Sequence, residues 1–374
     1  MIAWAGFAAG ALLLPATAIS VIKTFLIPRG TRSWLNSVVS RSVRAGFRLI
    51  TARIEDLGQR ARILSVAAPA FLLCLLSTWL VCLFLGFALL FWPLVRDFPA
   101  ALKMSGSSMF TLGFAVPAGP AESALVFLAS ISGLAVLAML ISYLPVLYAA
   151  YNRRETAVTM LEALAGAPPW GPELLARVAV ISNVATLPSI YAQWTQWAAD
   201  VSESHVNYRT LIYFRSPDPA AYWLLSLLAV LDGAAMHLAL NPGSAPPEAR
   251  PLLRVGYVAL RRLAGNAGLL VPEDPRPDDP LELTEAEFRD AVEWVRGAGW
   301  ETERDAAEAW PHFRGWRVNY ERAAYQLARH LDAPPAMWSG QRGPHRPPPR
   351  PPRRPADRRP LTRPPEPRPA DTGA

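Results

Sequence analysis

The chain has 374 residues, of which 52% are hydrophobic and 18% are charged. This composition excludes an intrinsically disordered chain and a collagen-like one, because neither has enough apolar residues for a packed interior. The apolar residues are concentrated in a few segments. Residues 63–95 and 123–152 each form a run of 30 or more positions without Asp, Glu, Lys or Arg. An α-helix needs about 20 apolar residues to cross a bilayer, so the sequence predicts a membrane protein.

The net charge of +7 combines segments of unlike charge. Residues 23–63 contain nine Lys or Arg and two acidic residues, and residues 341–374 contain nine Arg and three acidic residues. The rest of the chain is therefore acidic overall. This distribution argues against a folded nucleic-acid-binding face, and we expect no nucleic-acid partner. Membrane topology and a solvated tail explain the two basic clusters.

Residues 2–22 form a third segment without charged residues. One interpretation is a secretory signal peptide, because Ala16-Thr17-Ala18 resembles a small-residue cleavage site. However, no basic residue precedes the apolar stretch, and the positive charge follows it. We therefore expect an uncleaved spanning helix over residues 1–22, with the N-terminus outside.

Positive charge next to an apolar segment marks the cytoplasmic side of a membrane helix. By this rule the basic segment 23–63 is cytoplasmic, a helix at about 64–95 runs outward, and a helix at about 123–151 returns. Arg153 and Arg154 then lie at the cytoplasmic exit. The sequence thus predicts a multi-pass protein of the inner (plasma) membrane with a cytoplasmic C-terminus.

Segment 23–63 is expected to be a basic amphipathic linker. Apolar residues recur in it at spacings of three and four, with arginines between them: Trp34, Leu35, Val38, Val39, Val43, Phe47, Ile50, Ile54 and Leu57. These spacings place the apolar residues on one face of a helix. Two interpretations fit this pattern. The helix lies on the inner leaflet with its arginines near anionic lipids, or it packs against neighbouring helices.

Residues 153–340 are expected to form a cytoplasmic α-helical domain. Helices are predicted over residues 155–165, 171–182, 187–206, 208–213, 220–239, 248–268, 284–298, 302–309 and 316–332. Thr284 followed by Glu287 is typical of a capping box. The stretch 221–240 is apolar enough to suggest a fourth spanning helix, but Asp232 and His237 would be costly in lipid. We interpret it as a buried helix of the domain.

Residues 341–374 contain 12 prolines and nine arginines. Such a segment cannot bury a core and is expected to be disordered, with some polyproline II structure. The run Pro347–Pro352 resembles a ligand of proline-recognition domains, but a solvated tail is the favoured interpretation.

The connection between the two long apolar runs, residues 96–122, is the most informative part of the sequence. Asp97-Phe98-Pro99 predicts a capped helix start. A short helix is expected over Ala100–Phe110, long enough for about half a bilayer. A non-helical segment follows it, and such backbone is tolerated at membrane depth only inside protein or along a water-filled path.

This arrangement resembles the pore domain of the potassium channel superfamily. The residues that carry the resemblance are Thr111, Leu112, Gly113 and Phe114, which match the first four positions of the family's Thr-x-Gly-(Tyr/Phe)-Gly filter, with Ala115 in place of the second glycine. The resemblance covers residues 65–151 within a predicted two-helix pore-loop domain, 64–152. It implies four loops around one axis, hence a homotetramer, and backbone carbonyls that bind K⁺ or another monovalent cation.

Other residues bear on this resemblance. Ile141–Tyr148, Arg153-Arg154-Glu155, Glu203-Ser204-His205 and Tyr213–Ser216 look like segments of uncharacterised bacterial membrane proteins with an ion-channel domain. Gly133 and Pro145 are candidate hinges of the returning helix, where the alternatives are close helix packing for the glycine and a simple kink for the proline.

Two features depart from the family pattern. A glycine is normally required at position 115 for a left-handed backbone, which costs other residues about 1–2 kcal/mol. Lys103 on the short helix would repel cations if it faced the axis, or it extends outward to water. Both departures weaken the expectation of selective potassium conduction.

Catalysis finds little support in the sequence. The five histidines show no metal-ligand spacing, and no phosphate-binding or nucleophile motif is present. Cys74 and Cys82 lie within the first apolar run without a disulfide framework. We expect neither a catalytic residue nor a metal or cofactor. The leading hypothesis is a channel-like protein, followed by a non-conducting membrane-anchored scaffold or sensor, and then by a membrane enzyme.

Overall fold

The computed structural model of the chain describes residues 1–25, 33–54, 56–181, 183–340 and 351–352. Every regular element among these residues is a helix, which confirms the predicted all-α class. The predicted disordered tail lies outside the described residues, apart from Pro351 and Pro352.

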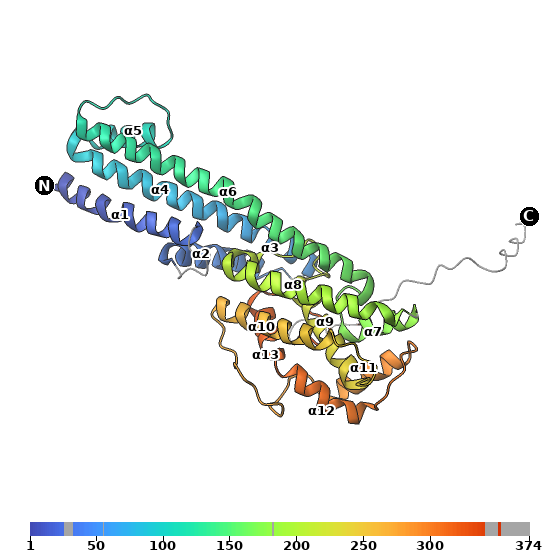
Figure 1. Ribbon diagram of the computed structural model, residues 1–374. Helices are drawn as coiled ribbons and strands as arrows, with labels where there is room; N and C mark the ends of the chain where they lie inside the picture. Colours follow the sequence, from blue (N-terminus) through green and yellow to red (C-terminus); the bar gives the residue numbers. More distant parts are fainter. Residues whose placement is uncertain (26–32, 55, 182, 341–350, 353–374) are drawn as a thin grey trace, which may run out of the picture.

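The N-terminal half of the chain supplies a long helical rod and the short helices attached to it. Its elements are α1 (Ile2–Phe25), α2 (Trp34–Thr51), α3 (Leu57–Ser65), α4 (Ala67–Val95), α5 (Phe98–Met109) and α6 (Pro120–Ala165). Helices α1, α4 and α6 run side by side, and α5 lies with its loop at the end of the rod near the N-terminus (Figure 1).

The C-terminal half folds into a compact helical domain at the opposite end of the rod (Figure 1). Its elements are α7 (Gly171–Val180), η1 (Val184–Thr186), α8 (Leu187–Asn207), η2 (Arg209–Tyr213), α9 (Trp223–Leu240), α10 (Ala249–Ala267), α11 (Glu285–Arg296), α12 (Ala306–Arg317) and α13 (Glu321–His330). The loop that follows α5 and this domain therefore lie at opposite ends of α6.

Four helical segments are long and apolar enough to span a membrane: Ile2–Phe25, Gly58–Val95, Pro120–Ala165 and Trp223–Leu240. The first three form the rod, and only 22%, 33% and 17% of their most apolar windows are buried, so most of their apolar side chains are exposed or partly exposed. A helix that is apolar on all sides and exposed is stable only in lipid or against another protein. These three helices identify a membrane protein and agree with the predicted spans.

The fourth apolar helix, α9, has no surface for lipid. All 18 of its residues are buried, and α7, α8, α10, α12 and α13 surround it. Asp232 within it forms an ion pair with Arg317 of α12. We therefore assign α9 as the central helix of the C-terminal domain, as the two polar residues in its sequence indicate.

Two glycines allow α1 and α4 to approach closely. A Cβ atom at Gly10 would lie 2.7 Å from the carbonyl oxygen of Gly86, and a Cβ atom at Gly86 would lie 2.6 Å from Leu14. Small residues at a crossing point let membrane helices gain van der Waals contact where the hydrophobic effect is absent. The first spanning helix is thus packed against the second as part of one bundle.

Helix α6 differs from the prediction of two helices around position 153. It continues unbroken from Pro120 to Ala165, so the predicted helix 155–165 is the last part of a 46-residue helix. No proline or glycine lies between residues 146 and 165 to end the helix there. The boundary between the membrane part and the C-terminal domain therefore lies inside a rigid element.

Two helices of the domain, α11 and α12, begin at side-chain caps. The Thr284–Glu287 capping box of α11 is present as predicted. A second capping box, Asp305 with Glu308, starts α12. The bounds predicted for the helices over 302–309 and 316–332 are wrong. Helix α12 runs through the aromatic segment from Trp310 to Trp316 and ends at Arg317, and α13 begins at Glu321.

Helix α2 packs part of its apolar face against the rod, as one of the two predicted interpretations has it, while Trp34 and Ile50 of that face are 75% and 59% exposed. Val39 is buried in the same apolar cluster as Leu75 and Trp79 of α4. The opposite face remains exposed and carries Arg41 and Arg48. Helix α2 is therefore amphipathic, with apolar residues against the membrane bundle and arginines on its exposed side.

Candidate functional site

Helix α5 begins at the capped start predicted from the sequence. The Asp97 carboxylate accepts a hydrogen bond from the Ala100 amide at 3.0 Å, and Pro99 lies in the first turn. The carboxylate satisfies an amide that has no helical partner and interacts favourably with the helix dipole. Twelve residues make a helix about 18 Å long, which is the length needed to cross about half of a bilayer.

Two serines and a glycine hold α5 between α4 and α6. The Ser105 hydroxyl donates to the Phe84 carbonyl oxygen of α4 at 2.7 Å. The Ser130 hydroxyl of α6 donates to the Ser108 carbonyl oxygen at 2.9 Å. A Cβ atom at Gly133 would overlap the Met109 carbonyl oxygen. The C-terminal end of α5, where the loop begins, is therefore held directly against α6.

Ser107 organises the loop that follows α5. Its carbonyl oxygen accepts hydrogen bonds from the Leu112 amide at 2.8 Å and from the Gly113 amide at 3.4 Å. Its hydroxyl oxygen accepts a hydrogen bond from the Ala115 amide at 2.9 Å. One residue thus ties three amides of the predicted filter segment to the end of α5.

The carbonyl oxygens of this segment are left without protein partners. Within the described part of the chain, no hydrogen bond reaches the carbonyl oxygens of residues 111–114. The Thr111 hydroxyl donates to the carbonyl oxygen of Phe110 at 2.8 Å. The loop therefore combines anchored amides with carbonyl oxygens that are open to another ligand, such as water or a cation.

The left-handed backbone expected at position 115 lies elsewhere in the loop. Left-handed backbone occurs at Thr111, with φ of 53°, and at Gly113, with φ of 72°. Gly113 adopts this conformation without cost, whereas Thr111 pays about 1–2 kcal/mol. Ala115 is outside the left-handed region and packs, half-buried, against the membrane-helix core. In this single chain the strain therefore lies at Thr111, the first residue of the predicted filter segment.

Large apolar side chains point out of the loop at alternate positions. Phe110, Leu112, Phe114 and Val116 are 45% to 81% exposed. Such a row of exposed apolar side chains is typical of a surface that contacts lipid or another chain. Lys103 is also exposed on α5, and the Glu122 carboxylate accepts a hydrogen bond from the Ala118 amide at 2.6 Å near the start of α6.

The two hinge candidates have different surroundings. Gly133 is buried against the end of α5, so close packing requires a glycine there. Pro145 is exposed. Helix α6 continues through both positions, and bending at either of them remains a hypothesis.

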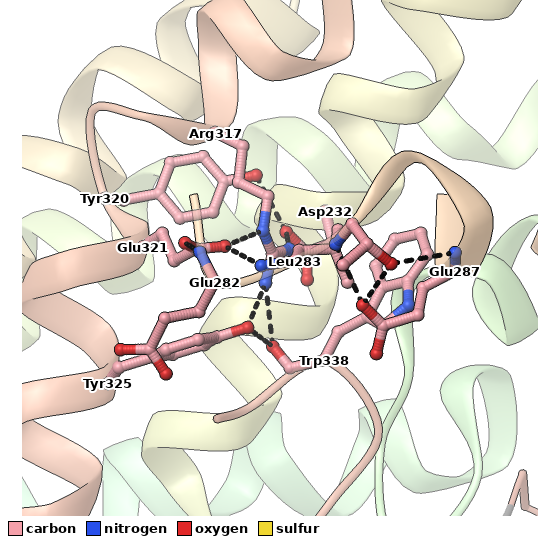
Figure 2. A network of polar contacts seen from close by, with 10 residues as sticks. Asp232, Glu282, Leu283, Glu287, Arg317, Tyr320, Glu321, Tyr325 and Trp338 are labelled. Atoms are coloured by element: carbon pink, nitrogen blue, oxygen red, sulfur yellow. Dashed lines mark hydrogen bonds and ion pairs between the residues drawn. The ribbon is translucent and has the colours of Figure 1, made fainter. Parts of the chain in front are cut away.

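A buried polar network in the C-terminal domain was missed by the sequence analysis, except for Asp232. Arg317 is fully buried and contacts the carboxylates of Asp232 and Glu321 (Figure 2). The same guanidinium donates to the Tyr325 hydroxyl at 2.7 Å and the Trp338 carbonyl at 2.8 Å. Burial raises the pKa of Asp232 to about 6, although Arg317 acts against this shift. The charged and hydroxyl groups of the network are all bound to groups of the domain itself. We therefore assign the network a structural role that holds α9, α12 and α13 together.

A second buried arginine joins α6 to the C-terminal domain. Arg154 forms an ion pair with Glu155 at 2.6 Å and donates to the carbonyl oxygens of Leu211 and Phe214. It also contacts the His205 ring at 3.0 Å. Burial and the neighbouring guanidinium hold the pKa of His205 well below its usual value. Movement of α6 would therefore be transmitted directly to α8 and η2.

The charged side chains of both networks are engaged with groups of the protein itself. The described residues contain no group of three or more His, Cys, Asp or Glu side chains suited to a metal ion. A small cavity of about 190 Å³ lies between α3 and the domain, lined mainly by prolines and alanines with Arg60, Arg215 and Asp332. These three are engaged with one another: Arg60 pairs with Asp332 at 2.8 Å, and Arg215 donates to the Asp332 carbonyl.

Comparison of the chain with protein-family models, with curated proteins and with solved structures finds no match.

Proposed function

We propose that this protein is a channel-like membrane protein whose copies surround a narrow path for monovalent cations, lined by residues 111–115. The observation that carries the proposal is the anchored loop: Ser107 holds three of its amides, while the carbonyl oxygens of residues 111–114 lack protein partners. Rings of such oxygens replace the hydration shell of a permeating cation. The resemblance through Thr111–Phe114 favours K⁺.

The proposed assembly is a homotetramer. One loop per chain cannot enclose an axis, so several copies must contribute. Helix α6 supports this assembly because it exposes a long apolar face, which comprises Phe127, Leu128, Ile131, Leu134, Leu137 and Ile141. In a tetramer this face and the exposed loop residues would lie against neighbouring copies and the central path.

The second candidate is a non-conducting membrane-anchored scaffold or sensor. It is favoured by Ala115, which replaces the second filter glycine and packs its side chain into the membrane-helix core. It is also favoured by the exposed cation Lys103 on α5. Under this alternative the loop keeps its fold, and Arg154 transmits the position of α6 to the C-terminal domain.

The proposed topology places the N-terminus and α5 outside and residues 155–374 inside the inner membrane. Its support is the basic segment 23–63, whose exposed Arg41 and Arg48 would then lie on the side of the anionic lipids. We expect a cysteine at Ala118 to react with a membrane-impermeant maleimide in intact cells, and one at Asp290 to react only after lysis. Labelling of position 290 in intact cells would contradict this topology.

The proposed function is tested with the full-length protein in liposomes and in lipid nanodiscs. We expect mass photometry of the nanodiscs to show four copies, and the liposomes to show K⁺ flux above that of protein-free vesicles. Four copies without flux would favour the scaffold. Monomers in both nanodiscs and mild detergent would exclude the pore, because a single loop encloses no path.

A further inference from the structure

One exposed face of the C-terminal domain is formed by α6 and α8, which lie side by side. Arg153 of α6 pairs with Asp200 of α8 at 3.3 Å. Further along α6, about two helix turns after Arg153, the Met160 sulfur lies 4.0 Å from the Gln193 amide nitrogen of α8. The two helices thus present a joint surface that begins where α6 leaves the membrane bundle (Figure 1).

This surface carries little charge beyond the Arg153–Asp200 pair at its edge near the membrane part, where the two side chains are 59% and 39% exposed. We define the α6–α8 face by the exposed residues that follow this pair: Thr156, Thr159, Met160, Glu162 and Ala163 of α6, and Ser189, Ala192, Gln193, Gln196 and Ala199 of α8. Glu162 is the one charged residue among these ten. At the distal edge of the face, Val180, Ile181 and Val184 are about half exposed.

The water-facing side of the same domain has the opposite composition. Helix α11 exposes a dense set of charged residues: Glu285, Glu287, Arg289, Asp290, Glu293 and Arg296. A helix that faces water gains solubility from such charges, whereas the centre of a protein interface is depleted of them. The contrast within one domain indicates that the α6–α8 face is covered by protein.

A second copy of this chain is the partner that fits this face. Helix α6 is one unbroken helix from Pro120 to Ala165, so copies that pack through its membrane half also bring their cytoplasmic halves together. Identical charged faces would repel each other, because like charges brought together cost several kcal/mol. A face of alanine, threonine and glutamine avoids this repulsion and permits hydrogen bonds between copies.

We propose that the α6–α8 face is the cytoplasmic contact between copies of this chain. The inference rests on the self-assembly under the proposed function, but it does not depend on conduction. It extends the assembly from the membrane into the C-terminal domains, whose positions are coupled to α6 by Arg154.

Cross-linking of the full-length chain tests the contact in native membranes. Cys74 and Cys82 are replaced with Ala, and single cysteines are placed at Thr159, Ala192 or Gln196 in the α6–α8 face. A short bis-maleimide is expected to join copies at these positions. A cysteine at Glu293, exposed on α11 of the same domain, is the matched control and is expected to give monomers.

A charge inserted into the face tests its importance for assembly. Ala192→Arg is expected to lower the fraction of assembled protein in detergent by roughly tenfold or more, because identical positive charges would meet in the contact. Ala286→Arg adds the same side chain at an exposed alanine of α11 and is expected to leave assembly unchanged.

The outcomes separate this inference from the proposed pore. A wild-type tetramer that shows no cross-link within the face, and that tolerates Ala192→Arg, would overturn the inference and leave the pore intact. Equal cross-linking at Glu293 would also overturn it, because collisions would explain the products. Cross-links within the face in a protein without flux would support the inference and exclude conduction.

Discussion

Arg317→Met is expected to lower the stability of the C-terminal domain by about 3–5 kcal/mol, the usual cost of removing one partner from a buried ion pair. For a domain of this size the loss corresponds to a decrease in Tm of roughly 10 °C. The physical reason is that Asp232 and Glu321 remain buried without their cation. Thermal unfolding of the full-length protein in nanodiscs, followed by tryptophan fluorescence, measures the effect.

The pH dependence of this loss has a definite sign. The pKa of Asp232 is about 6 in the folded protein and 3.8 in the unfolded reference, so the folded state holds the proton more tightly and loses stability as pH rises. Without Arg317 the folded pKa rises further. The destabilisation by Arg317→Met is therefore expected to be larger at pH 8 than at pH 6, by up to about 1.4 kcal/mol per unit.

Two further variants identify the cause. Adding Asp232→Asn to Arg317→Met is expected to restore part of the stability, because it removes one uncompensated charge. Arg289→Met removes an exposed arginine paired with Glu285 and is expected to cost less than about 1 kcal/mol. Equal losses for Arg289→Met and Arg317→Met, or no recovery in the double variant, would contradict the role of the network.

The sequence predicts the helical class and the membrane spans because both depend on local composition. Long runs without charge require a nonpolar environment, and the caps at Asp97 and Thr284 involve residues only three positions apart. Asp232 and His237 also distinguish α9 from a spanning helix, since charged groups in lipid are costly.

What the sequence does not reveal is long-range pairing. Arg317 and Asp232 are 85 positions apart, and nothing local to Arg317 distinguishes it from the exposed arginines nearby. The same holds for Arg154, whose partners at Leu211 and Phe214 follow from the packing of α6 against η2. In the loop, Ser107 has no sequence signal as an anchor, because its role depends on how residues 112–115 fold back onto α5.

The left-handed residues of the loop are not the ones that the family pattern predicts. The family pattern predicts a left-handed backbone at the residue that replaces the second glycine. In the structure the left-handed residues are Thr111 and Gly113, while the Ala115 amide is held by the Ser107 hydroxyl. Ala115 packs its methyl group against the membrane helices. It therefore does not take the left-handed backbone that the second glycine of the family pattern adopts.

Gly113→Ala is expected to abolish whatever K⁺ flux the wild-type protein shows. The φ of 72° at Gly113 is a left-handed conformation, which costs an alanine about 1–2 kcal/mol in every copy. Nothing lies within 4 Å of a Cβ atom at this position, so the loss would come from backbone geometry rather than from a steric clash. Flux assays in liposomes, with assembly verified by mass photometry, measure the effect.

Gly119→Ala is the matched control, because Gly119 lies in the same connection, has open space around it and is outside the left-handed region. It is expected to leave flux unchanged. Ala115→Gly is expected to raise K⁺ flux and its preference over Na⁺, because glycine frees the backbone to turn its carbonyl toward the path. Wild-type flux that survives Gly113→Ala would mean that ions pass outside the loop, and the pore assignment would then be wrong.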